Sequence, residues 1–358
     1  MIVETCWLII YLNTEIKRLL IGVQGKLLER RIFMTLDSRI MELAKAAKPA
    51  VAIIGLGGAG CNIVSWIAQK EIAGSRIIAS ETDAAHLLEV KADVKILMGE
   101  ENYHGKGCGG YAERGTEAAK ESIKEIKKEL SGSNLIFIIA GMGGGTGTGS
   151  ATVVAEATHE AGILTIGCVM MPFGYELLKR KKAIMGIKSL AQKCDALVVI
   201  DNSRLRAIAG TLPLRESFAI ANEFVGSFIK NISETITHAS LVNLDYSDLR
   251  SVVERGGISS IGIGEAQGEN RIQKAVELAL ASPLLDVSDI SGAYGVLIHI
   301  TGGEDMTLGE VTQAGEIILQ KAPNTGRIVW GAKVDESIEG TVKVIAVLTG
   351  VLDPKKLV

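Results

Sequence analysis

Glycines in two dense groups, each directly after an apolar run, are the residues of this sequence best suited to chemistry. The denser group, Gly141–Ser150, reads GMGGGTGTGS and follows the apolar run Asn134–Ala140. Glycine lets successive backbone N–H groups turn toward one point, and a helix start adds its positive end. The pattern predicts a phosphate-binding loop between a strand and a helix at Ala151–Ala161, with Thr146 and Thr148 as hydroxyl donors.

The second glycine group is Gly55–Asn62, GLGGAGCN, between an expected strand at Ala50–Ile54 and an expected helix at Ile63–Gln69. This is the G-x-G-x-x-G dinucleotide fingerprint, and Glu81 follows the next strand, Arg76–Ser80, at about the distance of the ribose-binding acid. Alone, it would indicate an NAD(P)-dependent oxidoreductase. The longer glycine loop farther along is not part of that pattern and favours a nucleoside triphosphate, so the oxidoreductase remains only an alternative.

A third glycine-rich stretch, Gly99–Ala112 (GEENYHGKGCGGYA), resembles a Walker A loop only superficially. The spacer before Gly105–Lys106 is one residue too long, and Gly107 stands where a Ser or Thr would bind Mg²⁺. We therefore reject a P-loop interpretation of this stretch.

Between these loops and the C-terminal third, the sequence predicts one long helix of about 25 residues that begins at Leu214. Its apolar residues step by three or four and form one continuous stripe. The stripe consists of Leu214, Phe218, Ala221, Val225, Phe228, Ile232 and Ile236.

Composition is that of a compact α/β protein of about two domains, with 358 residues, 47% hydrophobic residues and a mean hydropathy of +0.28. The net charge of −3 gives no electrostatic footprint for nucleic acid. The five cysteines contain no C-x-x-C pair, which supports neither a zinc site nor a disulfide framework and fits a reducing cytoplasm.

In its context, the GGGTGTG run resembles the signature of the tubulin/FtsZ family, and the detailed sequence is most similar to that of the archaeal-type FtsZ cell-division GTPases. The likeness covers roughly residues 48 to 351 and continues in Ser282–Asp286 (SPLLD) and Ile328–Glu336 (IVWGAKVDE). It implies an α/β fold with an N-terminal Rossmann-like GTP-binding domain on a parallel sheet, a long central helix and a C-terminal α/β domain. We expect an extension with a lead-in helix at 1–47, the GTP-binding domain at 48–212, the central helix at 213–240 and a C-terminal domain for polymerisation and GTPase activation at 241–358.

The resemblance also implies which residues bind GTP or GDP. Three loops would hold the phosphates: Gly57, Gly58, Ala59, Gly60, Cys61 and Asn62; Gly107, Cys108, Gly109 and Gly110; and Gly143, Gly144, Gly145, Thr146, Gly147 and Thr148. Glu176 would meet the ribose hydroxyls, with Arg180 near the nucleotide; the alternative is a surface ion pair one turn apart. Phe218 would stack on guanine, and Asn222 would read its edge beside Glu223.

Two departures from the family pattern concern charge and shape near the phosphates. Glu81–Thr82–Asp83 stands where the family has Asn-Thr-Asp, and a carboxylate at position 81 would repel phosphate unless a cation or basic group intervenes. Lys106 and Cys108 are substituted in the loop expected to sense the γ-phosphate. These departures motivate a second hypothesis within the family, a divergent paralogue with slow turnover and a scaffold or cell-shape role. Asp83 could act through water on a magnesium ion.

The segment Asn243–Asp248 matches the family's catalytic loop, N-x-D-x-x-D, with Asn243, Asp245 and Asp248 as the implied catalytic residues. Taken alone, Asp245 would be an ordinary helix N-cap. The acids follow the long helix, ~35–40 Å from the phosphate loops at a rise of about 1.5 Å per residue. They would therefore act on the nucleotide of another subunit, in an open head-to-tail filament that requires GTP and Mg²⁺.

The N-terminal residues 1–33 contain an apolar run, Trp7–Leu12, far shorter than the ~20 residues that span a bilayer. An interfacial helix is one interpretation; we favour an extra helix docked on the body, or Met34 as the true start. The sequence ends at Val358 without the linker and tail peptide by which many FtsZ proteins recruit membrane adaptors. The resemblance implies a cytoplasmic protein at the mid-cell division site, with itself and a membrane adaptor as candidate partners.

Overall fold

The computed structural model describes residues 48–352, apart from 71, 73, 238–241, 243, 255 and 282–289. The chain divides into two compact units, 1–48 and 49–358. The expectations for residues 1–33, for the lead-in helix and for Ser282–Asp286 lie outside the described residues and stay predictions. Side chains are not described at 206–208, 214 and 352.

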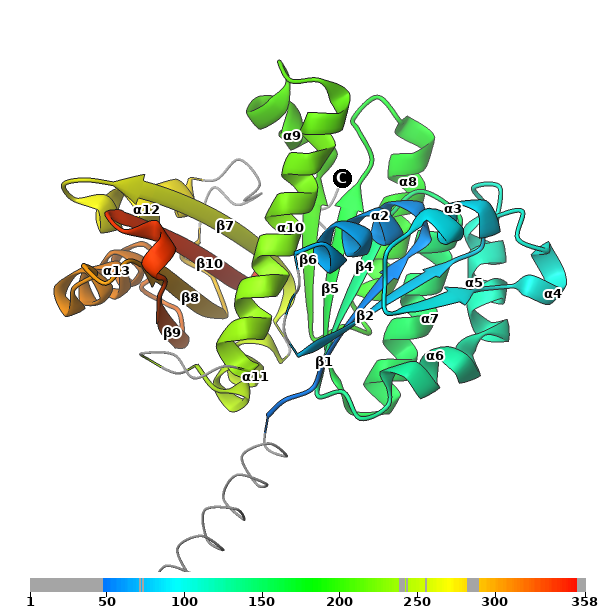
Figure 1. Ribbon diagram of the computed structural model, residues 1–358, viewed down its shortest axis with the longest axis horizontal. Coiled ribbons are helices and arrows are strands. Elements are labelled where there is room, and N and C mark those ends of the chain that lie inside the picture. The colour runs from blue at the N-terminus through cyan, green and yellow to red at the C-terminus, as the bar shows by residue number, and fades with distance from the viewer. Residues whose placement is uncertain are drawn as a thin grey trace, which may run out of the picture. The chain divides into compact units, whose positions relative to one another are not determined.

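A ten-stranded sheet runs through the second unit in the order β3-β2-β1-β4-β5-β6-β7-β10-β8-β9 (Figure 1). Strands β1 to β6 pair in parallel, and β7 continues the sheet through three parallel pairs with β6, from Ala196↔Gly257 to Val198↔Ser259. Beyond β7 the sheet is mixed, because β10 is antiparallel to both β7 and β8. The strands are β1 (Val51–Leu56), β2 (Ser75–Glu81), β3 (Val94–Leu97), β4 (Leu135–Gly141), β5 (Leu164–Met171), β6 (Ala196–Asp201), β7 (Gly257–Gln267), β8 (Gly295–Gly302), β9 (Arg327–Val334) and β10 (Thr341–Leu352).

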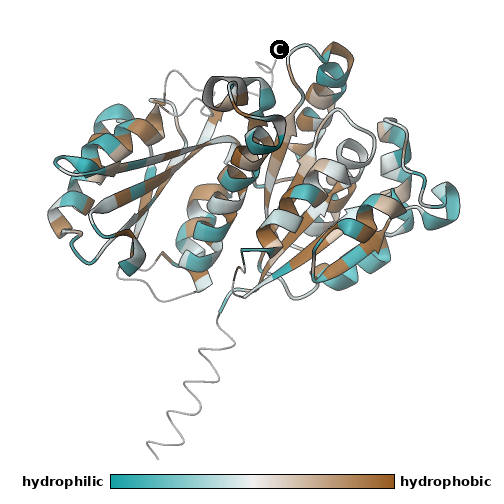
Figure 2. Cartoon of the chain, turned by 45° about the horizontal axis from the view of Figure 1, so that its top comes forward, coloured by the Kyte–Doolittle hydropathy of each residue, from teal (hydrophilic) through white to brown (hydrophobic). Residues whose placement is uncertain are grey.

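Helices cover both faces of the parallel half, as expected when crossover connections join parallel strands. Successive strand residues alternate between the two cores: Ile53 packs with α2, α10 and α11, whereas Ile54 packs with α5 to α8. Figure 2 shows the apolar strands enclosed by helices with polar outer faces. The helices are α2 (Gly57–Ala68), α3 (Ala84–Glu89), α4 (Glu100–Tyr103), α5 (Ala112–Glu121), α6 (Ile123–Leu130), α7 (Thr146–Glu160), α8 (Leu177–Leu190) and α9 (Asn202–Ala209).

The long helix predicted from Leu214 is present as α10 (Leu214–Thr237), with 24 residues. It packs against α2 at Gly226, where a Cβ atom would lie 2.1 Å from the Trp66 ring. After it come α11 (Tyr246–Val253), α12 (Arg271–Leu280), α13 (Leu308–Lys321) and the short 3₁₀ helix η1 (Glu336–Ile338). Helices α12 and α13 share a third core with the mixed part of the sheet. The α/β class, the parallel N-terminal sheet and the central helix are confirmed.

Several helix boundaries differ from the sequence-based expectation. Helix α7 begins at Thr146 rather than at Ala151, and α2 begins at Gly57 rather than at Ile63. Gly58 and Gly60 lie in the first turn of α2, and Gly147 and Gly149 lie in the first turn of α7, so part of each expected loop is helical. Helices α5 and α6 are separate helices that meet at Ser122, where φ is −91° and ψ is 5°.

Candidate functional site

A cavity of about 290 Å³ opens where β1 and β4 end and α2 and α7 begin. In Figure 1, β1 runs upward from the entering chain, so its carboxyl end lies beside the α2 N-terminus. This is the edge at which open parallel sheets bind ligands. The residues around the cavity are mostly glycines and other small side chains: Leu56, Gly57, Gly58, Ala59, Gly141, Met142, Gly144, Gly145, Thr146, Gly147, Met170, Met171, Pro172, Glu176, Lys179 and Asn202.

Two helix N-termini meet at this cavity, and close backbone approach explains why glycine is needed there. Gly57 has φ of +71°, and a Cβ on it would lie 2.7 Å from the Gly147 amide nitrogen. A Cβ on Gly147 would lie 2.6 Å from the Gly141 carbonyl oxygen, so these positions exclude side chains. The first N–H groups of each helix lack intrahelical partners and carry the positive end of the dipole, which suits an anion. Gly144, by contrast, has open space where its Cβ would be.

Not every predicted phosphate residue lines the cavity. A Cβ on Gly60 would lie 2.3 Å from the Ile139 carbonyl oxygen, so this glycine lets α2 pack on β4. Cys61 is fully buried against β1 and β2, and burial raises the pKa of its thiol. Gly143 has φ of +96°, and its amide donates to the Thr148 hydroxyl at 2.8 Å. Gly60, Cys61 and Gly143 therefore support the loops and do not line the cavity.

The third glycine loop joins the site through Thr82. Thr82 Oγ1 lies 2.7 Å from Thr146 Oγ1, and the Cys108 thiol lies 3.4 Å from the same Thr82 atom. Gly107, Gly109 and Gly110 all have positive φ, which places the loop backbone in conformations that favour glycine. The sequence analysis did not assign a role to Thr82, although its place at the carboxyl end of β2 was a usable signal.

Three polar side chains form a group beside the first phosphate loop. Glu81 Oε2 lies 3.6 Å from His86 Nδ1, and His86 Nε2 lies 3.0 Å from Asn62 Oδ1. Asp83 caps α3 by accepting from the His86 amide at 3.1 Å. Glu81, which departs from the family pattern, therefore has a basic neighbour in His86. Sequence reasoning missed this pair because no spacing pattern marks it.

Glu176 and Arg180 do not pair with each other, so the alternative of a surface ion pair between them is wrong. The Lys179 ammonium, 2.5 Å from Glu176 Oε1, holds the pKa of that carboxyl below its ordinary value. Arg180 donates to Pro172 O at 2.9 Å and to both Asp201 oxygens at 3.1 and 3.0 Å. Burial opposes ionisation of Asp201, but hydrogen bonds from Arg180 and Ser203 outweigh it and lower its pKa.

A second cavity, of about 540 Å³, is lined by the aromatic side chains of Phe173, Tyr175 and Phe218, together with smaller residues. Phe173 stacks on Tyr175 at 5.7 Å and meets Phe218 edge-on at 6.2 Å. Phe218 is 40% exposed although it belongs to the apolar stripe of α10, so it is not an ordinary core residue. Asn222 lies one turn farther along α10, and its neighbour Glu223 accepts from Ser227 at 3.1 Å.

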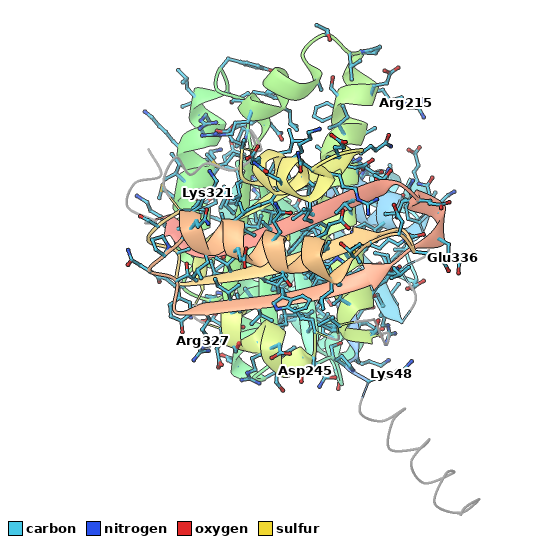
Figure 3. The ribbon with its side chains drawn as sticks, turned by 90° about the vertical axis from the view of Figure 1, so that its left-hand side faces the viewer. Lys48, Arg215, Asp245, Lys321, Arg327 and Glu336 are labelled. Atoms are coloured by element: carbon cyan, nitrogen blue, oxygen red, sulfur yellow. The ribbon has the colours of Figure 1, made fainter. Side chains whose placement is uncertain are left out.

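The two predicted catalytic acids lie on α11, far from both cavities. Asp245 accepts from the Asp248 amide at 2.7 Å, and Asp248 accepts from the Asp245 amide at 3.2 Å, which makes a reciprocal capping box. In Figure 3, Asp245 lies at the lower rim of the molecule, whereas Arg215, near the start of α10, lies at the upper rim. The structure brings the three glycine loops together and leaves these acids at the other end of α10. Asn243 lies outside the described residues.

These features define an α/β protein in which two helix N-termini meet at a cavity suited to an anion. The sequence model of the Tubulin/FtsZ family, GTPase domain, matches residues 50–210, and that of the FtsZ family, C-terminal domain, matches residues 257–352. The chain is 42% identical over 331 residues to cell division protein FtsZ 1 of Archaeoglobus fulgidus, covering 92% of this chain and 90% of the relative. It is also 42% identical over 320 residues to cell division protein FtsZ of Haloferax mediterranei, covering 89% and 85%.

Among solved structures, an empty FtsZ dimer from Methanocaldococcus jannaschii aligns with a TM-score of 0.82 and 43% identity. That alignment covers 88% of this chain and 92% of the solved one. The chain therefore belongs to the tubulin/FtsZ family and carries the family's GTPase domain, which binds GTP and GDP. Of the residues that the structure describes, none forms a helix long and apolar enough to cross a membrane.

Proposed function

We propose that this protein is an FtsZ-type cytoskeletal GTPase that assembles head to tail and hydrolyses GTP where two subunits meet. The observation that carries the proposal is the separation of the phosphate cavity from Asp245 and Asp248. The cavity lies at the start of α2 and α7, and the acids lie at the start of α11, beyond the other end of α10. Because one subunit cannot bring its own acids to its own phosphates, a second subunit must supply them.

The proposed binding roles follow the geometry of the loops. Backbone amides at the starts of α2 and α7 hold the phosphates, and Gly107–Gly110 approach the terminal phosphate. Phe218 stacks on the base, Asn222 and Glu223 read its edge, and Glu176 meets the ribose. Magnesium, the hard cation that accompanies nucleoside triphosphates, would supply positive charge to the phosphates, and Asp83 is the residue that would hold it through water.

The proposed catalytic roles belong to the opposite end of the neighbouring subunit. Asp245, Asp248 and Asn243 would orient the attacking water toward the γ-phosphate. Assembly is then heterologous, one end against the other, and such contacts yield open filaments. The proposed domain limits are an extension at 1–47, a GTP-binding domain at 48–212, a central helix at 213–240 and a polymerisation domain at 241–358.

The names of the relatives support a role in cell division, which we propose takes place as a ring at the mid-cell division site with the help of a membrane adaptor. The paralogue hypothesis, with slow turnover and a scaffold or cell-shape role, is motivated by the substitutions at Glu81, Lys106 and Cys108. The structural observation that favours it is the buried Glu81 carboxylate beside the first glycine loop.

The test is GTP hydrolysis by the purified full chain across a range of protein concentrations, with light scattering and electron microscopy of the same samples. We expect the rate per molecule to rise with concentration, together with filaments. Filaments with very slow phosphate release would support the paralogue hypothesis. A rate per molecule that is independent of concentration would contradict hydrolysis at a shared site.

A further inference from the structure

The carboxylate of Glu81 is buried at the edge of the phosphate site. The residue is 4% exposed, at the last position of β2. Its Oε2 atom would lie 3.7 Å from a Cβ on Gly58, one of the residues around the cavity. A negative charge so close to the site would repel a phosphate through a medium that screens poorly.

Hydrogen bonds link Glu81 through Thr82 to the second glycine loop. Its Oε1 atom accepts from the Thr82 amide at 2.8 Å, and Thr82 in turn contacts Thr146 on the second phosphate loop. The side chain therefore cannot swing away from the cavity without breaking this connection. In the described part of the chain, the one ion-pair partner found for Glu81 is His86.

The imidazole ring of His86 lies between two oxygen atoms. Its Nε2 is 3.0 Å from Asn62 Oδ1, and its Nδ1, which is buried without a hydrogen-bond partner, is 3.6 Å from Glu81 Oε2. A carboxylate accepts hydrogen bonds only, and an imidazole nitrogen facing it gains most when it carries a proton. If Nε2 also donates, the amide of Asn62 must present its oxygen to the ring and its NH₂ group elsewhere.

We propose that His86 is a positioning residue for phosphate binding. Its ring holds the Glu81 carboxylate at Nδ1 and the Asn62 amide oxygen at Nε2, which turns the NH₂ group of Asn62 away from the ring. Each contact depends on the other, because one rigid ring makes both. The proposal rests on the proposed binding of GTP at the starts of α2 and α7 and identifies how this chain tolerates an acid there.

The test is a double-mutant cycle on the full chain, using His86→Ala, Glu81→Gln and the double variant, with GTP, GDP and guanosine as ligands. We expect His86→Ala to weaken GTP binding by about tenfold or more, because Glu81 is left uncompensated. Guanosine, which has no phosphate, should bind equally to all four proteins. In the Glu81→Gln background, the same His86 change should weaken GTP binding by less than about threefold.

Two further variants separate charge from structure. His86→Gln keeps a donor for Asn62 but has no charge, so it should weaken GTP binding in the original background and far less beside Glu81→Gln. It also provides the cycle if His86→Ala does not fold. His159→Ala, an exposed histidine in the last turn of α7, is the matched control and should leave all three affinities unchanged.

The outcomes distinguish this inference from the proposed function. Equal losses of GTP affinity in both Glu81 backgrounds, or an equal loss for guanosine, would overturn the positioning role of His86. If the unmodified protein binds guanosine and GTP with the same affinity, the proposed phosphate site itself is wrong.

Discussion

Two regions of this protein hold their proposed functional groups by opposite means. One is the edge of the sheet where α2 and α7 begin, here called the phosphate edge, and the other is the start of α11, here called the acid end. At the phosphate edge the groups are neutral backbone amides, fixed by close contacts such as that between Gly57 and Gly147. At the acid end they are the charged side chains of Asp245 and Asp248, fixed by two hydrogen bonds within one helix cap. The first region needs packing to keep its geometry, and the second needs only a local turn.

In the proposed function, this difference separates GTP binding from GTP hydrolysis. A change at the acid end need not alter how GTP binds, and a change at the phosphate edge need not disturb the acids. Variants in each region test that separation.

The largest effect is expected at the acid end, from Asp245→Asn and Asp248→Asn. Asparagine caps helices about as well as aspartate, so α11 should stay folded. Loss of the two carboxylates should lower GTP turnover by about 10²–10⁴-fold at saturating protein, because a general base is removed. GTP affinity, measured by titration, should not change. Asp335→Asn, at the N-cap of η1, is the control with the same chemical change; normal turnover in both acid variants would refute the assignment.

At the phosphate edge, Gly144→Val should weaken GTP binding at least about tenfold, equal to 1.4 kcal/mol. A Cβ atom at position 144 would meet no protein atom within 4 Å, so we expect the protein to fold normally, with the added side chain in the space proposed for phosphate. Gly315→Val on α13, where a Cβ atom would also meet nothing within 4 Å, is the matched control. Unchanged affinity in the Gly144 variant would move the phosphate site elsewhere.

The base contact should show a smaller effect. Phe218→Ala should weaken GTP binding by about tenfold, as expected for loss of one aromatic stacking contact. Thermal stability should change little, because Phe218 is 40% exposed. Tyr294→Ala, with a similarly exposed ring at 43%, serves as the control. Should the Phe218 variant lose stability and keep its affinity, the residue belongs to the core rather than to the site.

The smallest effect concerns acid stability in the C-terminal half. Hydrogen bonds from Arg271 lower the pKa of Glu310 to about 2. Since that pKa lies below its unfolded value, the pair stabilises the fold above about pH 4.5 and loses this contribution as pH falls toward 2. Glu310→Gln should therefore reduce the free energy of unfolding by about 1–2 kcal/mol near neutral pH and by less in acid.

Chemical denaturation at several pH values measures this difference. We expect the affinity for GDP, which in the proposed site depends on backbone amides, not to follow the pH dependence of the Glu310→Gln effect on stability. A Glu310 effect that is constant across pH would contradict the assigned ion pair.

The fold was largely predictable because buried strands and the stripe of α10 leave strong patterns. The apolar run at 134–140 located β4 to within a residue, and the stripe located α10 from its first residue. Helix starts were not predictable at Gly57 and Thr146, because glycine runs are read as loops although their backbones can complete a helical turn. The break at Ser122 also left no signal, since both flanking segments have helical patterns.

At the site, sequence could identify the glycines and the acids but not the partners across elements. The bidentate pairing of Arg180 with Asp201 joins α8 to the end of β6, and the contact of Glu81 with His86 joins β2 to α3. Such pairs depend on side-chain directions that only the fold defines. The roles assigned to the glycine loops, to Phe218 and to the two acids stay predictions.

The central claim, that the active site is shared between two subunits, is tested most directly by mixing two impaired variants, at a GTP concentration too low to saturate Gly144→Val. Gly144→Val has intact acids and an impaired phosphate site, whereas Asp248→Asn has the reverse. If GTP on one subunit is hydrolysed by the acids of the next, the mixture should release phosphate faster than the two variants measured separately and added. A mixture whose rate equals that sum, under conditions in which the two proteins co-assemble, would contradict the account.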